Sequence, residues 1–446
     1  MAPSINPTTA NSTSDVKLAG HVGHLTTKET EMLKQMWSML TELFQQPGTE
    51  LKAPEKKVEE APAKKKAGGW GFGRKEKKES TQIELFLGAT IDPSLLSLPI
   101  EKAIPQIPGS ALRKTFWSMV ATDNPDAVIL RFLRARKWDL DAAYKMLINT
   151  LRWRLVMRVD EITALGETGL KDELEKIKPG MGECLIQQLH SGKAFLGGPD
   201  KSGRGICFVN VRFHHKDDQP LEILKILTIL IMETSRLVVA QPTEAVCIVF
   251  NLDRFTLSNM DYDFVKFLLT CFEAYYPETL GSCQIYKAPW VFSTVWAVIK
   301  PWLDPVVASK INFADNLDQL TQFIDMGALP SCITGETDKM SKDEIQMNPP
   351  QAGTLVNVTP AIKAYEEAID EYEQETTRWI SASSPEEEGR KSLARKYRNA
   401  RIQAENDIRG STSYHVKGLV QITDEGRLVV DYGSEGWVPK DITDTV

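Results

Sequence analysis

Between Gly180 and about residue 315 the chain alternates short apolar runs with helical patterns, and no other feature constrains its fold as strongly. Four runs are candidate strands: Ile206–Val211, Val246–Phe250, Gln284–Ala288 and Lys310–Phe313. The first two are nearly continuous and rich in β-branched residues, as expected of strands covered on both faces. Helical patterns separate the four runs, at residues 221–239, 261–275 and 291–302. Strands joined through helices need crossover connections, which predict an α/β fold with a mostly parallel sheet.

Residues 100–165 carry the pattern of a small helical unit. Asn124 and Pro125 place a capping residue and a proline at the start of one helix. Asp139 caps a longer helix. One apolar stripe follows it, made of Leu140, Tyr144, Leu147, Leu151 and Leu155.

The first 80 residues are expected to form an extension. Residues 1–25 are rich in Ser, Thr, Asn and Pro and predict a disordered arm. A short helix is expected at about 26–46, where apolar residues recur at steps of three and four. Lys52–Glu79 holds ten Lys or Arg against five Glu, a local net charge of +5, with Trp70 and Phe72 among its glycines. This segment is interpreted as a solvated linker, with contact to anionic lipid as the alternative.

The C-terminal part, 355–446, predicts a second extension. Two charged helical patterns cover Thr359–Trp379 and Pro385–Ile408. A candidate hairpin follows, with strands at Val416–Thr423 and Arg427–Tyr432.

Charge and cysteine usage narrow the function classes. A net charge of −7 and a pI near 5.6 argue against bulk attraction to nucleic acid. The six cysteines form no CxxC pair, and no secretory signal is recognised, so a reducing, cytoplasmic location is expected. The longest uncharged stretch considered, Ala288–Ile299, has twelve residues, short of the ~20 that span a bilayer.

Enzyme motifs are missing from the sequence. It contains no HExxH, GxSxG, GxxxxGK[ST] or strand-following GxGxxG. Gly197–Gly203 faintly suggests a phosphate loop but is better interpreted as a turn. The six histidines show no ligand spacing, so no metal, no cofactor and no catalytic activity are expected.

Five short motifs together resemble the CRAL-TRIO lipid-binding family, specifically the fungal phosphatidylinositol transfer proteins. They are Arg131–Trp138, Tyr275–Gly281, Ala288–Phe292, Lys300–Pro305 and Ser309–Ile311. Their order and separations match the family over roughly residues 95–337. The resemblance implies a helical N-lobe over 95–170 and an α/β lobe over 175–337. The sheet would floor a lipid-sized cavity, closed by a mobile gate helix at about 290–303.

The apolar side chains of these segments are the candidate cavity lining. From the gate helix and the adjacent strand and helix we expect Trp290, Phe292, Val295, Trp296, Ile299, Val246, Ile248, Phe250 and Phe267. The alternative for 290–299 is a buried core helix with no gating role.

The resemblance also implies a head-group site. In the phosphatidylinositol binders of this family, the glutamate of the Tyr-Tyr-Pro-Glu motif and the lysine of the Ser-Lys-Ile motif bind the inositol phosphate. These match Glu278 and Lys310, and the arginine that closes the Arg-Ala-Arg motif is Arg136. The chemistry is apt, because a phosphate needs a cation and inositol hydroxyls need acceptors. A structural ion pair is the alternative.

The chain departs from the family where choline lipids are bound. Val246 and Ile248 stand where choline-lipid binders alternate serine and threonine, Cys207 stands where a tyrosine is expected, and Val307 where threonine is frequent. We therefore expect inositol-lipid binding together with a less polar second ligand, such as a sterol-like hydrophobe.

The function expected is that of a monomeric, non-enzymatic phosphatidylinositol carrier that associates transiently with endomembrane surfaces. Its ligand is phospholipid, and nucleic acid is not expected as a partner. The alternative is a signalling or tethering module with a vestigial lipid lobe, in which the extensions bind partners.

Overall fold

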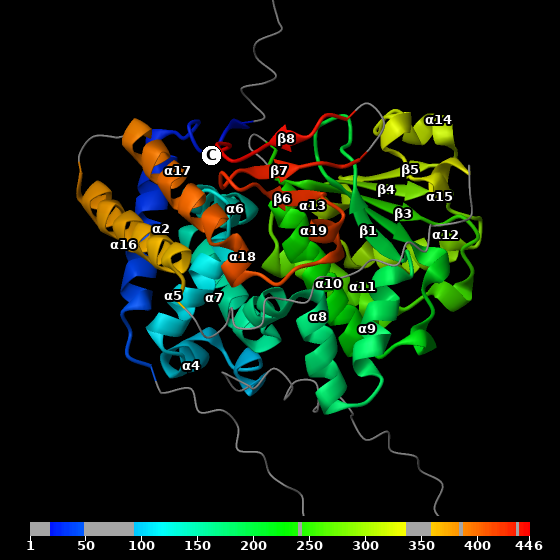
Figure 1. Ribbon diagram of the computed structural model, residues 1–446, viewed down its shortest axis with the longest axis horizontal. Helices are drawn as coiled ribbons and strands as arrows, with labels where there is room; N and C mark the ends of the chain where they lie inside the picture. Colours follow the sequence, from blue (N-terminus) through cyan, green and yellow to red (C-terminus); the bar gives the residue numbers. More distant parts are fainter. Residues whose placement is uncertain (1–17, 49–92, 240–242, 336–357, 383–386, 434–436) are drawn as a thin grey trace, which may run out of the picture.

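The computed structural model describes residues 18–48, 93–239, 243–335, 358–382, 387–433 and 437–446 (Figure 1). The predicted arm up to residue 17 and the basic segment Lys52–Glu79 lie outside the described residues.

A five-stranded sheet forms the centre of the α/β lobe (Figure 1). Its strands lie side by side in chain order: β1 (Ala194–Gly197), β2 (Ile206–Asn210), β3 (Val246–Asn251), β4 (Leu280–Tyr286) and β5 (Ile311–Ala314). Strands β2 to β5 run parallel, and β1 is antiparallel to β2. The predicted mostly parallel sheet is confirmed, although β4 begins at Leu280, before the expected Gln284, and β1 was not predicted.

The two faces of the sheet pack differently because side chains alternate along each strand. Phe208 and Val249 lie in a core cluster with residues of α14 (Leu317–Leu320) and α15 (Ser331–Thr334). Cys207 and Ile248 point to the opposite face. The helices on that side are α10 (Leu221–Ser235), α11 (Tyr262–Thr270) and α12 (Phe292–Ile299).

Most of the helices that precede the sheet form a helical lobe. They are α2 (Thr27–Phe44), α4 (Ile100–Ala103), α5 (Gly109–Val120), α6 (Pro125–Ala135) and α7 (Leu140–Met157). Helices α8 (Val159–Ile177) and α9 (Met181–His190) follow them and pack against α10 of the α/β lobe. The predicted caps of α6 and α7 are confirmed, because Asn124 accepts a hydrogen bond from the Asp126 amide and Asp139 from the Ala142 amide. Helix α2 is capped by Thr26.

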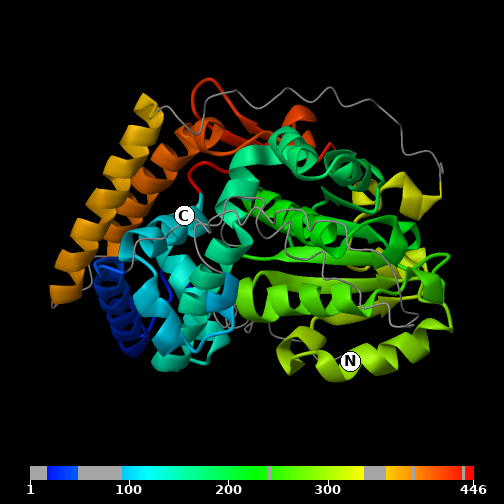
Figure 2. The same ribbon diagram turned by 90° about the horizontal axis from the view of Figure 1, so that it is seen from below.

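The C-terminal residues contact both lobes. They form α16 (Pro360–Ser381), α17 (Glu387–Gln403), α18 (Glu405–Ile408), α19 (Ser413–Val416) and a small sheet of β6 (Val420–Ile422), β7 (Leu428–Val430) and β8 (Lys440–Asp441). The predicted helices and hairpin are thus present. Helices α16 and α17 pack on the helical lobe, and the small sheet packs in the core cluster that contains α10. Figure 2 shows α16 and α17 in orange beside the blue α2, at the end of the molecule away from α12. Rings from four helices pack there: the ring centroids of Trp37 and Tyr372 lie 5.8 Å apart, and those of Trp117 and Tyr397 lie 5.1 Å apart.

Short helical turns complete the chain: η1 (Pro93–Leu96), η2 (Ile104–Gln106), η3 (Val211–Phe213), η4 (Lys216–Asp218), η5 (Arg236–Val238), η6 (Leu257–Asn259), η7 (Cys271–Tyr275), η8 (Lys300–Trp302), α13 (Pro305–Ala308) and η9 (Met326–Ala328). Among the described helices, none combines the length and the apolar character needed to cross a bilayer.

Candidate functional site

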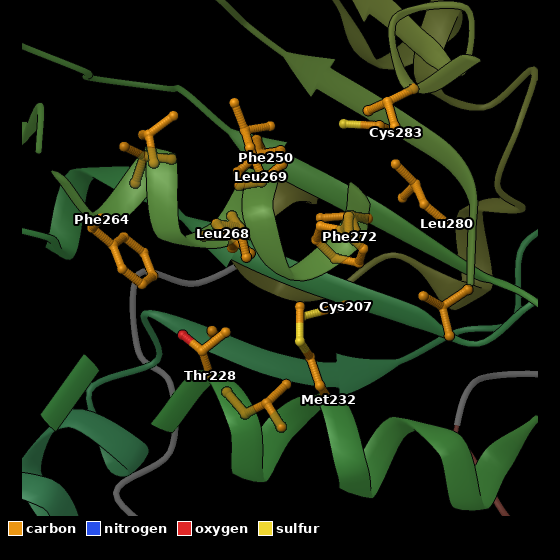
Figure 3. Close-up of a pocket in the computed structure, with 18 of the residues that line it drawn as sticks. Cys207, Thr228, Met232, Phe250, Phe264, Leu268, Leu269, Phe272, Leu280 and Cys283 are labelled. Atoms are coloured by element: carbon orange, nitrogen blue, oxygen red, sulfur yellow. The ribbon is translucent and has the colours of Figure 1, made fainter. Parts of the chain in front are cut away.

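A cavity of about 270 Å³ lies between the sheet and helices α10, α11 and α12. Its walls are almost entirely aliphatic, aromatic or thiol side chains, and Figure 3 shows Cys207, Phe250 and Cys283 of the strands facing Met232, Leu268 and Phe272 of the helical segments. The volume is near the lower end of the ~300–1,000 Å³ typical of ligand pockets. The dominant contacts available to an occupant are therefore apolar.

The cavity runs along the full length of β4. Thr279 and Ile285 both line it, and six residues of extended strand at ~3.3 Å each span about 20 Å. One leaflet of a bilayer has a hydrocarbon depth of roughly 15 Å, half of the ~30 Å core. The cavity is thus long enough for a membrane-derived chain to lie extended.

Six of the expected lining residues line this cavity: Val246, Ile248, Phe250, Phe292, Trp296 and Ile299. The other three do not. Val295 is buried in the core beside the cavity, Trp290 is 87% exposed, and Phe267 packs on α10, with Lys225 Nζ 5.8 Å from its ring centroid. Phe292, Val295, Trp296 and Ile299 share the inner face of α12, and of these Val295 packs into the core cluster beside the cavity and does not line it.

Helix α12 is apolar toward the cavity, and its outer side exposes Ser293 and Thr294 together with Ala297 and Val298. Its inner face lines the cavity, while Val298 on its outer side is 42% exposed. Trp290 precedes the helix, and Val306 in α13 is 50% exposed. Contiguous exposed apolar side chains mark surfaces that bind protein or lipid. The helix is therefore buried on its inner side only, and its role as a gate stays a prediction.

The positions that depart from the choline-lipid pattern all contribute to the cavity wall. Cys207, Val246, Ile248 and Val307 line it, and burial raises the pKa of the Cys207 thiol to about 12. At neutral pH none of these four side chains carries a charge. This stretch of wall therefore gives a charged choline head group no ionic partner.

Glu278 and Lys310 lie at the amino edge, which is the edge of the sheet where β3, β4 and β5 begin. Glu278 precedes β4 by two residues, and the carbonyl of Lys310 accepts a hydrogen bond from the Cys283 amide at 2.8 Å. The pairing of Cys283 with Ile311 sets Lys310 about four residues further along the sheet than Glu278. The two side chains share an edge, and no ion pair joins them within the part of the chain that the structure describes.

The arginine nearest Glu278 is Arg134, whose Nε lies 4.0 Å from Glu278 Oε2. Arg136 follows the last residue of α6 and is exposed. Arg134 also donates to Glu244 at 2.8 Å, and Arg131 Nε lies 3.7 Å from the same carboxylate. The structure thus brings Glu278 together with Arg134 and not with Arg136.

Buried charges close the amino-edge end of the cavity. Asp123, Arg131, Arg236 and Glu244 line it there. Burial alone would raise the pKa of Asp123, but Arg131 at 2.8 Å and Arg236 at 3.4 Å outweigh burial and hold it below its ordinary value. This cluster was not predicted, although the i, i+3 spacing of Arg131 and Arg134 on one helix face was a signal for it.

Polar residues also occur at the opposite, carboxyl edge of the sheet. His214 and Asp261 follow β2 and β3, and Lys193 precedes the antiparallel β1; all three line the cavity. The sequence pattern of the histidines, His214 among them, was interpreted above only in terms of metal binding. In the described residues no group of three or more His, Cys, Asp or Glu could hold a metal ion.

Comparison with known proteins gives two matching family models. The CRAL/TRIO domain matches residues 189–335 and the CRAL/TRIO N-terminal domain matches residues 32–149. A CRAL-TRIO domain-containing protein of Schizosaccharomyces pombe is 35% identical over 351 residues, 77% of each chain. The phosphatidylinositol transfer protein CSR1 of Eremothecium gossypii is 33% identical over 443 residues, 90% of this chain and 98% of that protein. Among solved structures, the crystal structure of Sfh5 overlaps 53% of this chain and 76% of that chain, with 18% identity and a TM-score of 0.38.

Proposed function

This chain belongs to the CRAL-TRIO family, and on that premise we propose that it is a non-enzymatic protein that binds phosphatidylinositol and transfers or presents it between membranes. The observation that carries the proposal is the apolar cavity that extends along β4 under α12. The name of the CSR1 relative supports the choice of lipid.

The energetics of lipid extraction explain why such a cavity is needed. Removing a diacyl lipid from a bilayer exposes its chains at about 0.8 kcal/mol per CH₂, of order 20 kcal/mol for the whole lipid. Water offers nothing to offset this cost, whereas a wall of aliphatic and aromatic side chains does. A carrier therefore encloses the chains and leaves the polar head group at the rim.

We place the head group at the amino edge. Lys310 would bind the phosphate and Glu278 would accept hydrogen bonds from inositol hydroxyls. Arg134 Nε lies 4.0 Å from Glu278 Oε2, so a cation stands beside this acceptor. Arg136 remains a predicted head-group contact, and its exposure leaves it accessible.

We propose that α12 is the gate and that it meets the membrane transiently. Trp290 and Val298 would enter the lipid surface, where tryptophan is favoured. The proposal includes a monomeric, cytoplasmic protein with transient association to endomembranes and no nucleic-acid partner.

The test is transfer of labelled phosphatidylinositol between vesicle populations. Lys310→Ala and Glu278→Ala are expected to reduce transfer at least tenfold while the unfolding midpoint stays near that of the parent. Lys363→Ala removes a lysine that is 72% exposed on α16 and serves as the matched control, with unchanged transfer expected. If the delipidated parent takes up no labelled phosphatidylinositol, the proposal is wrong.

A second candidate function is carriage of a neutral hydrophobe such as a sterol-like lipid. The observation in its favour is the uncharged cavity wall at Cys207, Val246, Ile248 and Val307. Mass spectrometry of the lipid that co-purifies with the protein distinguishes the two ligands.

A further inference from the structure

His214, at the carboxyl-edge end of the cavity, is a buried polar side chain that makes no hydrogen bond through its ring. The residue is 7% exposed and lines the cavity. Within the described residues, neither Nδ1 nor Nε2 has a hydrogen-bond partner. Buried polar atoms are nearly always paired, because a dry and unpaired donor or acceptor is costly. The ring therefore has an unused donor and an unused acceptor beside the cavity.

The backbone fixes the position of this ring. The His214 amide donates to the Val211 carbonyl at 2.9 Å, and Asn259 Nδ2 donates to the His214 carbonyl at 3.0 Å. The imidazole packs against the Phe264 ring, with centroids 5.8 Å apart. Figure 3 shows Phe264 and Thr228 at one end of the pocket, with Leu280 toward the other. The site is thus preorganised at the end away from the proposed head-group residues.

Charges around the ring restrict what it can bind. Asp261 Oδ2 lies 3.7 Å from Nε2, too far for a hydrogen bond, and Asp261 Oδ1 caps α11. Lys193 Nζ is buried and donates to Gln188 at 2.5 Å and Gln219 at 2.8 Å. Burial, and then the nearby Lys193, lower the pKa of His214 to about 4. At neutral pH the ring is uncharged, so one of its nitrogens can donate a hydrogen bond and the other can accept one.

The geometry points to a hydroxyl-binding subsite at His214 that receives the single hydroxyl group of an uncharged lipid. A hydroxyl both donates and accepts, which matches a neutral imidazole. Asp261 and Lys193 carry opposite charges and both lie near the ring, so the surroundings do not select for a charged group of one sign. Ligands of open α/β sheets bind beyond the carboxyl ends of the strands, where this subsite lies. The inference rests on the proposed function, since it requires that the cavity hold lipid.

The experiment compares three probes that differ in one terminal group: pyrene-labelled dodecanol, dodecane and dodecanoic acid. The delipidated full chain is expected to bind the alcohol about tenfold tighter than the alkane, the worth of one good hydrogen bond. His214→Phe keeps the ring size and removes both nitrogens, so the preference for the alcohol should vanish while alkane binding is retained. His214→Gln keeps a donor and an acceptor and should restore part of the preference.

His215→Phe is the matched control, because His215 is the adjacent residue, is exposed and does not line the cavity. It should leave all three affinities unchanged. Equal binding of alcohol and alkane by the parent, or tightest binding of the acid, overturns the subsite. Uptake of labelled phosphatidylinositol, measured in the same samples, separates the two failures: if it is intact the subsite alone is wrong, and if it is lost the carrier proposal is wrong as well.

Discussion

Glu244 is the buried carboxylate around which the arginines of the amino edge gather. It is 8% exposed, and Arg134 reaches it at 2.8 Å and Arg131 at 3.7 Å. Arg134 is also the arginine closest to Glu278. One residue therefore links the buried charge cluster to the proposed head-group site.

Replacing Arg134 should cost far more stability than replacing Arg136. Arg134→Met removes a charge-assisted hydrogen bond from a buried carboxylate, so we expect a loss of about 2 kcal/mol in the free energy of unfolding. Arg136→Met changes an exposed side chain and should stay within about 0.5 kcal/mol. Urea denaturation of both variants gives the comparison, and equal losses would contradict the assignment of Arg134 to the buried cluster.

The motif predicts that an arginine contributes to the head-group site at the amino edge, but it does not identify which arginine does so. Arg131 and Arg134 lie three residues apart on α6 and turn inward together, whereas Arg136 lies past the last helical residue. The face of a helix that becomes buried depends on the segment that packs against it. For α6 that segment carries Glu244, which is far from α6 in the sequence. His214 was missed for the same reason, because only the fold shows that its neighbours leave its ring unpaired.

At the scale of single elements, α12 has an unusual composition for a surface helix. Its inner face lines the cavity, and its outer side exposes Val298 beside Ser293 and Thr294, next to the exposed Trp290. A helix at a water interface normally carries polar residues throughout that side. The exposed apolar side chains are explained if this surface meets lipid for part of the time.

Trp290→Ser should weaken binding to phospholipid vesicles without destabilising the fold. Burial of a large aromatic side chain in the membrane is worth about 1.5–3 kcal/mol, so partitioning should fall about tenfold or more. The side chain is 87% exposed, so the unfolding free energy should change by no more than about 0.5 kcal/mol. Vesicle sedimentation measures the first quantity and urea denaturation the second.

Val438→Ser is the control for the α12 prediction, because Val438 is 77% exposed and lies in the C-terminal segment. Equal effects of the two substitutions on sedimentation would mean that α12 has no special part in membrane contact.

Elements with strong local patterns could be predicted from the sequence, and those defined by tertiary contacts could not. Strands β2 and β3 are continuous apolar runs and were found almost to the residue. Strand β1 has four residues ahead of Gly198 and Pro199, and its strand character comes from antiparallel pairing with β2. The π-helical turn η7 ends at Tyr275, and the next residue, Tyr276, donates to the buried Glu233 at 2.8 Å. That contact has no local signature.

At the scale of the whole molecule, the C-terminal extension packs on both lobes, with α16 and α17 on the helical lobe and the small sheet in the core cluster of α10. Asp126 on α6 accepts hydrogen bonds from Trp37 of α2 at 2.7 Å and from Arg390 of α17. Arg398 donates to the carbonyls of Ile442 and Thr443 at the end of the chain. Polar contacts thus hold the extension at two places, to α6 through Arg390 and, at the end of the chain, to α17 through Arg398.

Buried charged groups also connect these parts of the molecule. Because their pKa values differ between the folded and unfolded chain, the free energy of unfolding depends on pH. Burial alone would raise the pKa of Glu233 and Glu405, but their arginine partners outweigh it and lower both values to about 2. Burial lowers the pKa of His415 to about 4. All three groups bind protons more readily when unfolded, since the unfolded values are near 4.3 for Glu and 6.5 for His. Acid therefore favours the unfolded chain.

We expect two windows of stability loss as the pH falls. His214 and His415 act first, between about pH 6.5 and 4, and Glu233 and Glu405 act between about pH 4.5 and 2, each at up to ~1.4 kcal/mol per pH unit. Urea denaturation at pH 7, 5 and 3 measures the slope. His415→Gln should reduce the slope of the upper window only, because Gln cannot titrate, retains an acceptor for Thr412, and leaves His214 to titrate there. A parent whose unfolding free energy is unchanged from pH 7 to 5 would show that the two histidines are not held neutral by burial.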